Sequence, residues 1–155
     1  MKNPFDHPAM IDIGLFLSRL TLGLNMLIAG WNKITGLGLG GFADGPFMSL
    51  KPGWLPDAVA RPYGYMIPVL EFACGLLLVI GLFTRWSAGI TALMLLSIFI
   101  AVLGKSGLSG GEKVAIHYSI VFGCLAFLLA VIGAGRLSLD ALYFSGNGPA
   151  PKGKA

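Results

Sequence analysis

Long apolar stretches separated by short polar or Gly/Pro-rich segments dominate the chain. Trp86–Gly104 and Val114–Gly135 contain no Asp, Glu, Lys or Arg. Two further stretches, 11–31 and 63–83, each carry one charge in their interior, Arg19 and Glu71, and the first also has Asp12 at its start. A helix needs about 20 apolar residues to cross a bilayer. The pattern predicts an all-α protein, an integral membrane four-helix bundle with helices at about 11–31, 63–83, 86–104 and 114–133.

The connections between these helices differ in length and composition. Residues 36–62 are rich in Gly and Pro and contain Phe42, Phe47 and Trp54, a mixture typical of a segment lying on the membrane interface. We expect a long interfacial loop there, with an unstructured loop as the alternative. A tight hairpin is expected at 82–85 and a short loop at 104–111. Residues 1–144 then form one domain, and 145–155 are expected to be a disordered tail.

Composition supports the bilayer as the surroundings of this chain. Only 18 of its 155 residues are charged, 12%, against roughly 25% in soluble domains. The mean hydropathy is +0.80, and a soluble domain of this size buries only about 70% of its surface. These values exclude a disordered chain, a nucleic-acid binder and a secreted disulfide scaffold.

The distribution of basic residues does not settle the orientation. Four spans place both termini on one side, and the positive-inside rule compares the two sides. Each side carries five basic residues: Lys2, Arg85, Arg136, Lys152 and Lys154 against Lys33, Lys51, Arg61, Lys105 and Lys113.

Three polar side chains fall inside predicted spans, where they are costly and hence candidate functional residues. From the helical rise, Arg19 lies about 10 Å deep, Asn25 about 20 Å and Glu71 about 21 Å. Arg19 either pairs with Glu71 or extends to its nearer membrane face. Asn25 matches the depth of Glu71 better. Glu71 is a candidate proton carrier beside a quinol, or it fixes the bundle by a hydrogen bond.

Cys74 and Cys124 come out at similar depths, about 17 and 18 Å. They form a redox pair only if the second and fourth helices touch; otherwise they are small packing residues. Their spacing matches neither a CxxC motif nor a metal site, so no metal is expected.

A second candidate site lies near the opposite face. His117 and Tyr118 begin the last helix, close to Lys33 at the end of the first. Such a cluster, with Asn25, could hold a quinone head group, whereas the simpler interpretation of His117 is a capping residue. No nucleotide-binding or haem-attachment motif occurs.

Several segments resemble one family. Leu17–Gly23 (LSRLTLG) and Ala29–Ile34 (AGWNKI) are similar to the opening of the DoxX family of small bacterial and archaeal membrane proteins. Val69–Arg85 resembles its second helix, and Gly133–Asp140 (GAGRLSLD) its ending. The resemblance extends from Gly14 to Leu142.

The resemblance implies a four-helix bundle in the cytoplasmic membrane with both termini in the cytoplasm. Members of this family are associated with thiosulfate:quinone oxidoreductase, with terminal quinol oxidase complexes and with membrane assemblies that handle oxidative stress. The matching polar positions are Arg19, Lys33, Glu71, Arg85, Arg136 and Asp140. Cys74, Cys124 and His117 are not part of the family pattern.

The polar residues that follow the second and fourth helices suggest a docking surface. Arg85, Arg136 and Asp140 would form a polar cytoplasmic mouth for a soluble partner. Arg136 and Asp140 are four residues apart and could pair, and Ser138 or Asp140 could cap a short helix through Phe144.

Three functional hypotheses remain. The first is a subunit of a quinone-linked oxidoreductase complex that anchors a partner or handles quinone and protons, with Glu71 and Arg19 as catalytic candidates. The second is a non-catalytic membrane scaffold or assembly subunit, and the third is a small oligomeric transporter. The expected partners are the lipid bilayer, further subunits of a redox complex and further copies of this chain, without nucleic acid.

Overall fold

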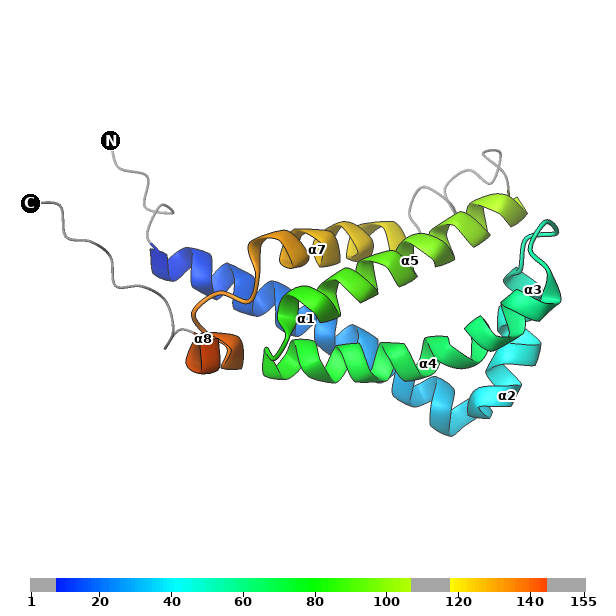
Figure 1. The fold of residues 1–155 in the computed structure, drawn as a ribbon, viewed down its shortest axis with the longest axis horizontal. Coiled ribbons are helices and arrows are strands. Elements are labelled where there is room, and N and C mark those ends of the chain that lie inside the picture. Colours follow the sequence, from blue (N-terminus) through cyan, green and yellow to red (C-terminus); the bar gives the residue numbers. More distant parts are fainter. Residues whose placement is uncertain (1–7, 107–117, 145–155) are drawn as a thin grey trace, which may run out of the picture.

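The structure is a computed structural model that describes residues 8–106 and 118–144, and within them it contains helices and turns but no strand. The four long helices are α1 (Pro8–Asn32), α4 (Asp57–Ile80), α5 (Thr84–Ser106) and α7 (Tyr118–Ile132). A short helix, α8 (Leu139–Phe144), follows α7. Successive long helices run in opposite directions, with α2 and α3 at one end of the bundle and α8 at the other (Figure 1).

The four long helices form a closed ring in the order α1, α4, α5, α7. α1 packs mainly on α4 and α5 mainly on α7, while α4–α5 and α1–α7 contacts complete the ring. α4 and α7 therefore lie across a diagonal. Buried apolar side chains fill the centre, among them Leu22, Met26, Ile67, Leu78, Leu95 and Leu129.

Within residues 8–106 and 118–144, three helical segments are long and apolar enough to cross a membrane: Ala9–Leu50, Asp57–Ile80 and Thr84–Lys105. The apolar helix α7, Tyr118–Ile132, is shorter. Large apolar side chains such as Trp86, Leu93 and Phe127 face outward. The chain is an all-α membrane bundle, as its sequence predicts.

The connection between the first two spans is helical, which corrects the expected long loop over 36–62. α1 continues through a π-helical turn, η2 (Lys33–Leu37), then α2 (Gly38–Phe42), a second π-helical turn, η3 (Ala43–Phe47), and α3 (Met48–Leu50). Only residues 51–56 are non-helical before α4 begins. Figure 1 shows the path bending at α2.

Glycine and proline kink this segment without unfolding it. Gly38 has a positive φ of 70°, and Pro46 lies inside η3. Near a bilayer, helical hydrogen bonds satisfy backbone groups that water does not reach. Phe47 anchors the segment, because it packs on Gly64 of α4 with its ring centre 5.9 Å from that of Tyr63.

Glycines bring α1 and α4 into unusually close contact. A Cβ on Gly30 would lie 2.5 Å from the backbone nitrogen of Phe72, and one on Gly75 would lie 2.4 Å from that of Leu27. Real Cβ atoms do not come so near, so both positions require glycine. This contact fixes how far α1 is shifted along α4, and hence which polar residues of the two helices meet.

Candidate functional site

A buried ion pair joins the first two spans. The Lys33 Nζ lies 2.5 Å from both carboxylate oxygens of Glu71. The Glu71 side chain is 2% exposed and that of Lys33 22%. Lys33 begins the π-helical turn η2, and such turns occur frequently at functional sites.

The direction of the side chains explains this pairing. Side chains on a helix tilt toward its N-terminus, so Lys33 leans back along α1 while Glu71, on the antiparallel α4, leans toward it. The Gly30 and Gly75 contacts place Glu71 level with the end of α1. Lys33 is then only about 3 Å further along the axis.

Both expected partners of Glu71 are therefore wrong. Arg19 lies about 18 Å from Glu71 along the axis and bonds elsewhere, and Asn25 is exposed on α1. The tilt rule that separates Arg19 from Glu71 also favours Lys33. The rule applies to Lys33 only because helical structure continues past Asn32, which the sequence did not show.

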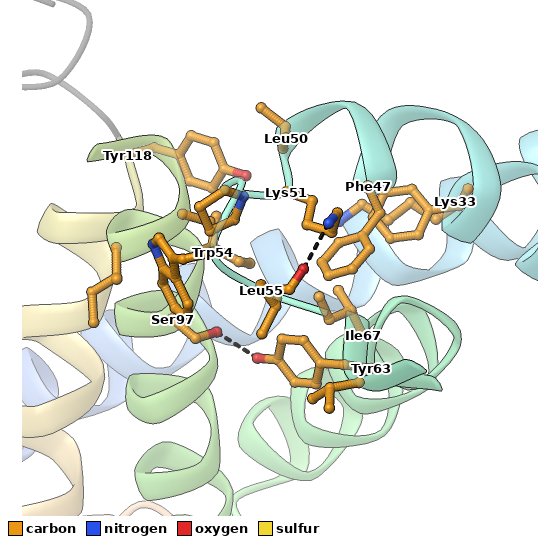
Figure 2. Close-up of a pocket in the computed structure, with 16 residues that line it drawn as sticks. Lys33, Phe47, Leu50, Lys51, Trp54, Leu55, Tyr63, Ile67, Ser97 and Tyr118 are labelled. Carbon is orange, nitrogen blue, oxygen red and sulfur yellow. Dashed lines mark hydrogen bonds between the residues drawn. The ribbon is translucent and has the colours of Figure 1, made fainter. Parts of the chain in front are cut away.

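A cavity of about 330 Å³ lies beside Lys33. Its walls are mostly aromatic and aliphatic and include Phe42, Phe47, Trp54, Leu55 and Ile67. Figure 2 shows Phe47 of the helical connection, Trp54 and Leu55 of the 51–56 segment and Ile67 of α4 around this cavity. The segment expected to be an interfacial loop thus supplies much of the cavity wall.

Polar groups stand at a few points of this cavity. The Tyr63 hydroxyl and the Ser97 Oγ are 2.5 Å apart and share a hydrogen bond. The Lys33 Nζ lies 5.1 Å from the centre of the Phe42 ring. Lys51 donates to the Leu55 carbonyl at 2.6 Å and pairs with Asp57. An apolar pocket with a few placed donors suits a small lipophilic molecule that carries hydrogen-bond acceptors.

Sequence reasoning found only part of this site. Lys33, predicted from the sequence as a quinone-site candidate, lines the cavity, and Tyr118 also lines it. The quinone assignment itself stays a prediction. His117 lies outside the described residues. Tyr63, Ser97 and Lys51 were missed as site residues, because single hydroxyls and an interfacial lysine give no distinctive pattern before the helices are assembled.

The two cysteines do not meet. Cys74 is buried on α4 and Cys124 is exposed on α7, and both are free thiols. Since α4 and α7 lie across the diagonal of the ring, the condition for a Cys74–Cys124 pair is not fulfilled. Among the residues that the structure describes, no group of three or more His, Cys, Asp or Glu could hold a metal ion.

Arg19 closes the end of the bundle that carries α8. Its side chain is 2% exposed and donates to the carbonyls of Ala134 at 3.3 Å and Leu137 at 2.8 Å. The guanidinium also lies 5.6 Å from the centre of the Phe16 ring. Arg19 does extend toward the near end of its helix, but it ends in protein rather than in solvent.

Two carboxylates hold the same end together. Asp140 accepts hydrogen bonds from the backbone nitrogens of Phe83 at 2.7 Å and Thr84 at 2.8 Å, at the start of α5. Asp12 accepts one from the backbone nitrogen of Arg136 at 2.9 Å. Ser138 caps α8 through Ala141 at 3.1 Å, as the sequence suggests.

The expected docking surface changes accordingly. Asp140 caps α5 instead of pairing with Arg136, whose side chain is exposed. Arg85 donates to the Ile132 carbonyl at 3.2 Å. None of the ion pairs found within residues 8–106 and 118–144 includes Arg85 or Arg136.

The fold and its buried charges define a class: an integral membrane helical bundle held together by ion pairs and side-chain caps between helices. The DoxX family model matches residues 14–104, and the chain belongs to the DoxX family.

One curated relative is the Inner membrane protein YqjF of Escherichia coli (strain K12). It is 29% identical over 135 residues, which cover 84% of this chain and 92% of the relative. No solved structure matches the chain.

Proposed function

We propose that this chain is the quinone-binding membrane subunit of an oxidoreductase complex and that the quinone ring occupies the cavity beside Lys33. The cavity carries this proposal. Its volume of about 330 Å³ falls at the lower end of the range typical of ligand pockets, about 300–1,000 Å³. Its apolar walls and few donors suit a ring that has a carbonyl on each side.

The chain's own residues would bind and orient the ring. The Lys33 ammonium is a donor suited to one ring carbonyl. Ser97 donates to the Met94 carbonyl, so the Tyr63 hydroxyl donates to the Ser97 Oγ and would have to turn away from Ser97 to donate to the other ring carbonyl. Trp54, Phe42 and Phe47 would exclude water from the ring faces. A bound quinone would accept two electrons and two protons, and the proposal assigns the electron donor to a partner subunit.

The relative supports a location in the cytoplasmic membrane. YqjF is named as an inner membrane protein, and we place this chain in the cytoplasmic membrane as well. The DoxX-like ending around Arg136 supports cytoplasmic termini, which would put the α8 end of the bundle on the cytoplasmic side and the cavity at the opposite face.

A cavity-filling substitution tests the proposal. Ala101→Phe introduces a ring into the cavity, whereas Ala73→Phe adds the same ring on an exposed position of α4 that does not line it. After purification in lipid nanodiscs, quinone extracted per chain should fall several-fold in Ala101→Phe only. Equal quinone in both variants, or none in the unmodified protein supplied with quinone, would rule the proposal out.

A second candidate function is a non-catalytic scaffold or assembly subunit. The observation that favours it is the structural use of the polar residues. Arg19 bonds to the connection between α7 and α8, Glu71 to Lys33 and Asp140 to the start of α5. A scaffold predicts that Glu71→Gln lowers the amount of assembled complex without changing quinone reduction per complex. The quinone-binding subunit predicts that Glu71→Gln also lowers quinone reduction per complex, because Lys33 loses its partner beside the cavity. The ratio of activity to complex therefore separates the two functions.

A further inference from the structure

A second hollow lies on the outer face of the bundle, between α5 and α7. Its volume is about 740 Å³, and it shares no lining residue with the cavity beside Lys33. The walls are apolar, with Ile90, Leu93, Leu96 and Phe127 among them. Arg85 lines it together with Trp86, at the end of α5 nearest α8.

Small residues leave this groove open. A Cβ added to Gly89 would meet nothing within 4 Å, and one added to Gly123 would meet only Leu95, at an ordinary 3.7 Å. The glycines between α1 and α4 differ, because there the partner backbone fills the space. No described part of this chain fills the space above Gly89.

The positively charged Arg85 lies at one end of this apolar groove. Arg85 is exposed, its described hydrogen bond goes to the Ile132 carbonyl, and no ion pair within the described ranges includes it. The exposed Arg136 follows α7 at the same end of the molecule. The carboxylates at this end, Asp12 and Asp140, accept hydrogen bonds from backbone N–H groups and form no ion pair with Arg85 or Arg136 within the described ranges. This end therefore places two arginines without an ion-pair partner at the start of an apolar groove.

The groove is long enough to span the hydrocarbon of one bilayer leaflet. From Arg85 to Phe99 the lining residues span about 21 Å of α5, from a rise of about 1.5 Å per residue. Half of the hydrocarbon core is about 15 Å thick. A molecule with its anionic group at Arg85 would thus have room for an extended acyl chain beside Gly89 and Leu93.

We propose that this groove is a binding site for one anionic phospholipid, with its phosphate at Arg85 and an acyl chain between α5 and α7. Arg85 supplies the charge complementarity, and Gly89 and Gly123 supply the space for the chain. The site is separate from the quinone cavity and does not depend on the proposed function. One bound lipid would then fill the groove between α5 and α7 on the outer face of the bundle.

Gly89→Leu is the direct test, because the side chain enters the groove without meeting protein atoms near its Cβ, and leucine favours helix over glycine. Gly14→Leu is the matched control, since Gly14 is also open and lies on α1 away from the groove. Delipidated protein in detergent is titrated with phosphatidylglycerol, and native mass spectrometry counts the lipids retained per chain.

The unmodified protein and Gly14→Leu should each retain one phosphatidylglycerol. Gly89→Leu should weaken retention at least about tenfold, which corresponds to the lost burial of about two methylene groups. Arg85→Gln should also weaken it, whereas Arg61→Gln, an exposed arginine paired with Asp44 and outside the groove, should not.

Two results would overturn the proposal. One is equal lipid retention in Gly89→Leu and Gly14→Leu. The other is a lipid-free dimer that Gly89→Leu converts to monomers, which would make a second copy of the chain the occupant of the groove. The same spectra report both masses, and folded protein is verified by size-exclusion chromatography before the titration.

Discussion

At the scale of single residues, buried charge controls this bundle. Glu71 is almost fully enclosed, and its charge is balanced by Lys33 alone among the described ion pairs. Removing one partner from a buried pair leaves an uncompensated charge, whereas replacing both by apolar groups of similar size is often neutral. The pair therefore lends itself to a test of its own.

Glu71→Leu alone should destabilise the protein strongly, by about 3–5 kcal/mol, because the Lys33 ammonium stays partly buried without its carboxylate. The double variant Lys33→Met/Glu71→Leu should recover most of that loss. Thermal unfolding in detergent measures both. If the double variant were as unstable as the single one, the pair would be stabilising through specific geometry and not merely through charge balance.

Gly81 shows a second residue-level constraint. It ends α4 with a φ of +73°, and a Cβ there would lie 2.3 Å from the Arg19 Nη1. Gly81→Ala should therefore lower stability by at least about 1–2 kcal/mol, the usual cost of the left-handed conformation for other residues. The control Gly36→Ala has open space and no positive φ, and a similar loss in both variants would refute this explanation.

At the scale of elements, the helical continuation of α1 matters most. Residues 33–50 turn the chain from α1 toward α4 and line the cavity with Phe42 and Phe47. Two π-helical turns allow the bend while nearly every turn remains hydrogen-bonded. Of the aromatic residues that suggested an interfacial loop, Phe47 packs on Tyr63 and Gly64, and Phe42 packs on Phe47.

Hydrogen exchange tests this helical connection. Amides of residues 39–50 should exchange slowly, as helical hydrogen bonds require, and those of residues 51–56 should exchange faster where they lack such bonds. Mass spectrometry of protein in nanodiscs resolves the two segments. Equally fast exchange in both segments would contradict the helical connection and favour the loop that the Gly/Pro content predicts.

At the scale of the whole molecule, hydrogen bonds at the α8 end of the bundle join parts of the chain that are distant in sequence. Arg19 reaches carbonyls 115 and 118 residues away, and Asp140 caps α5 from 56 residues further along the chain. The backbone nitrogen of Asp140 also bonds to the Gly81 carbonyl at 2.9 Å. The ring of helices is thus closed at this end by polar contacts.

Asp140→Ala should destabilise the α8 end of the bundle. It removes the acceptor of two backbone N–H groups, a loss of about 1–3 kcal/mol for partly buried groups. Asp140→Asn, which keeps one acceptor oxygen, should lose less. The loss of stability is measured as a lower unfolding temperature and as faster proteolysis after Arg136. Equal losses in Asp140→Ala and Asp140→Asn would exclude the capping role.

The sequence alone determined the all-α class, the four apolar segments and the DoxX resemblance. It could do so because a bilayer forces each spanning segment to satisfy its own backbone and to be about 20 apolar residues long. It also singled out Arg19, Lys33, Glu71 and Asp140 as candidate functional residues. A pattern of this kind shows which face a residue occupies, but not its neighbour.

Only the tertiary structure decided which of these side chains contact one another. The order of helices in the ring separated Cys74 from Cys124, and the close glycine contact set the shift of α1 along α4 that brings Lys33 to Glu71. The bonds of Arg19 and Asp140 join residues far apart in the chain. Such pairings depend on register and ring order, which follow from packing of the whole bundle and leave no local signal in the sequence.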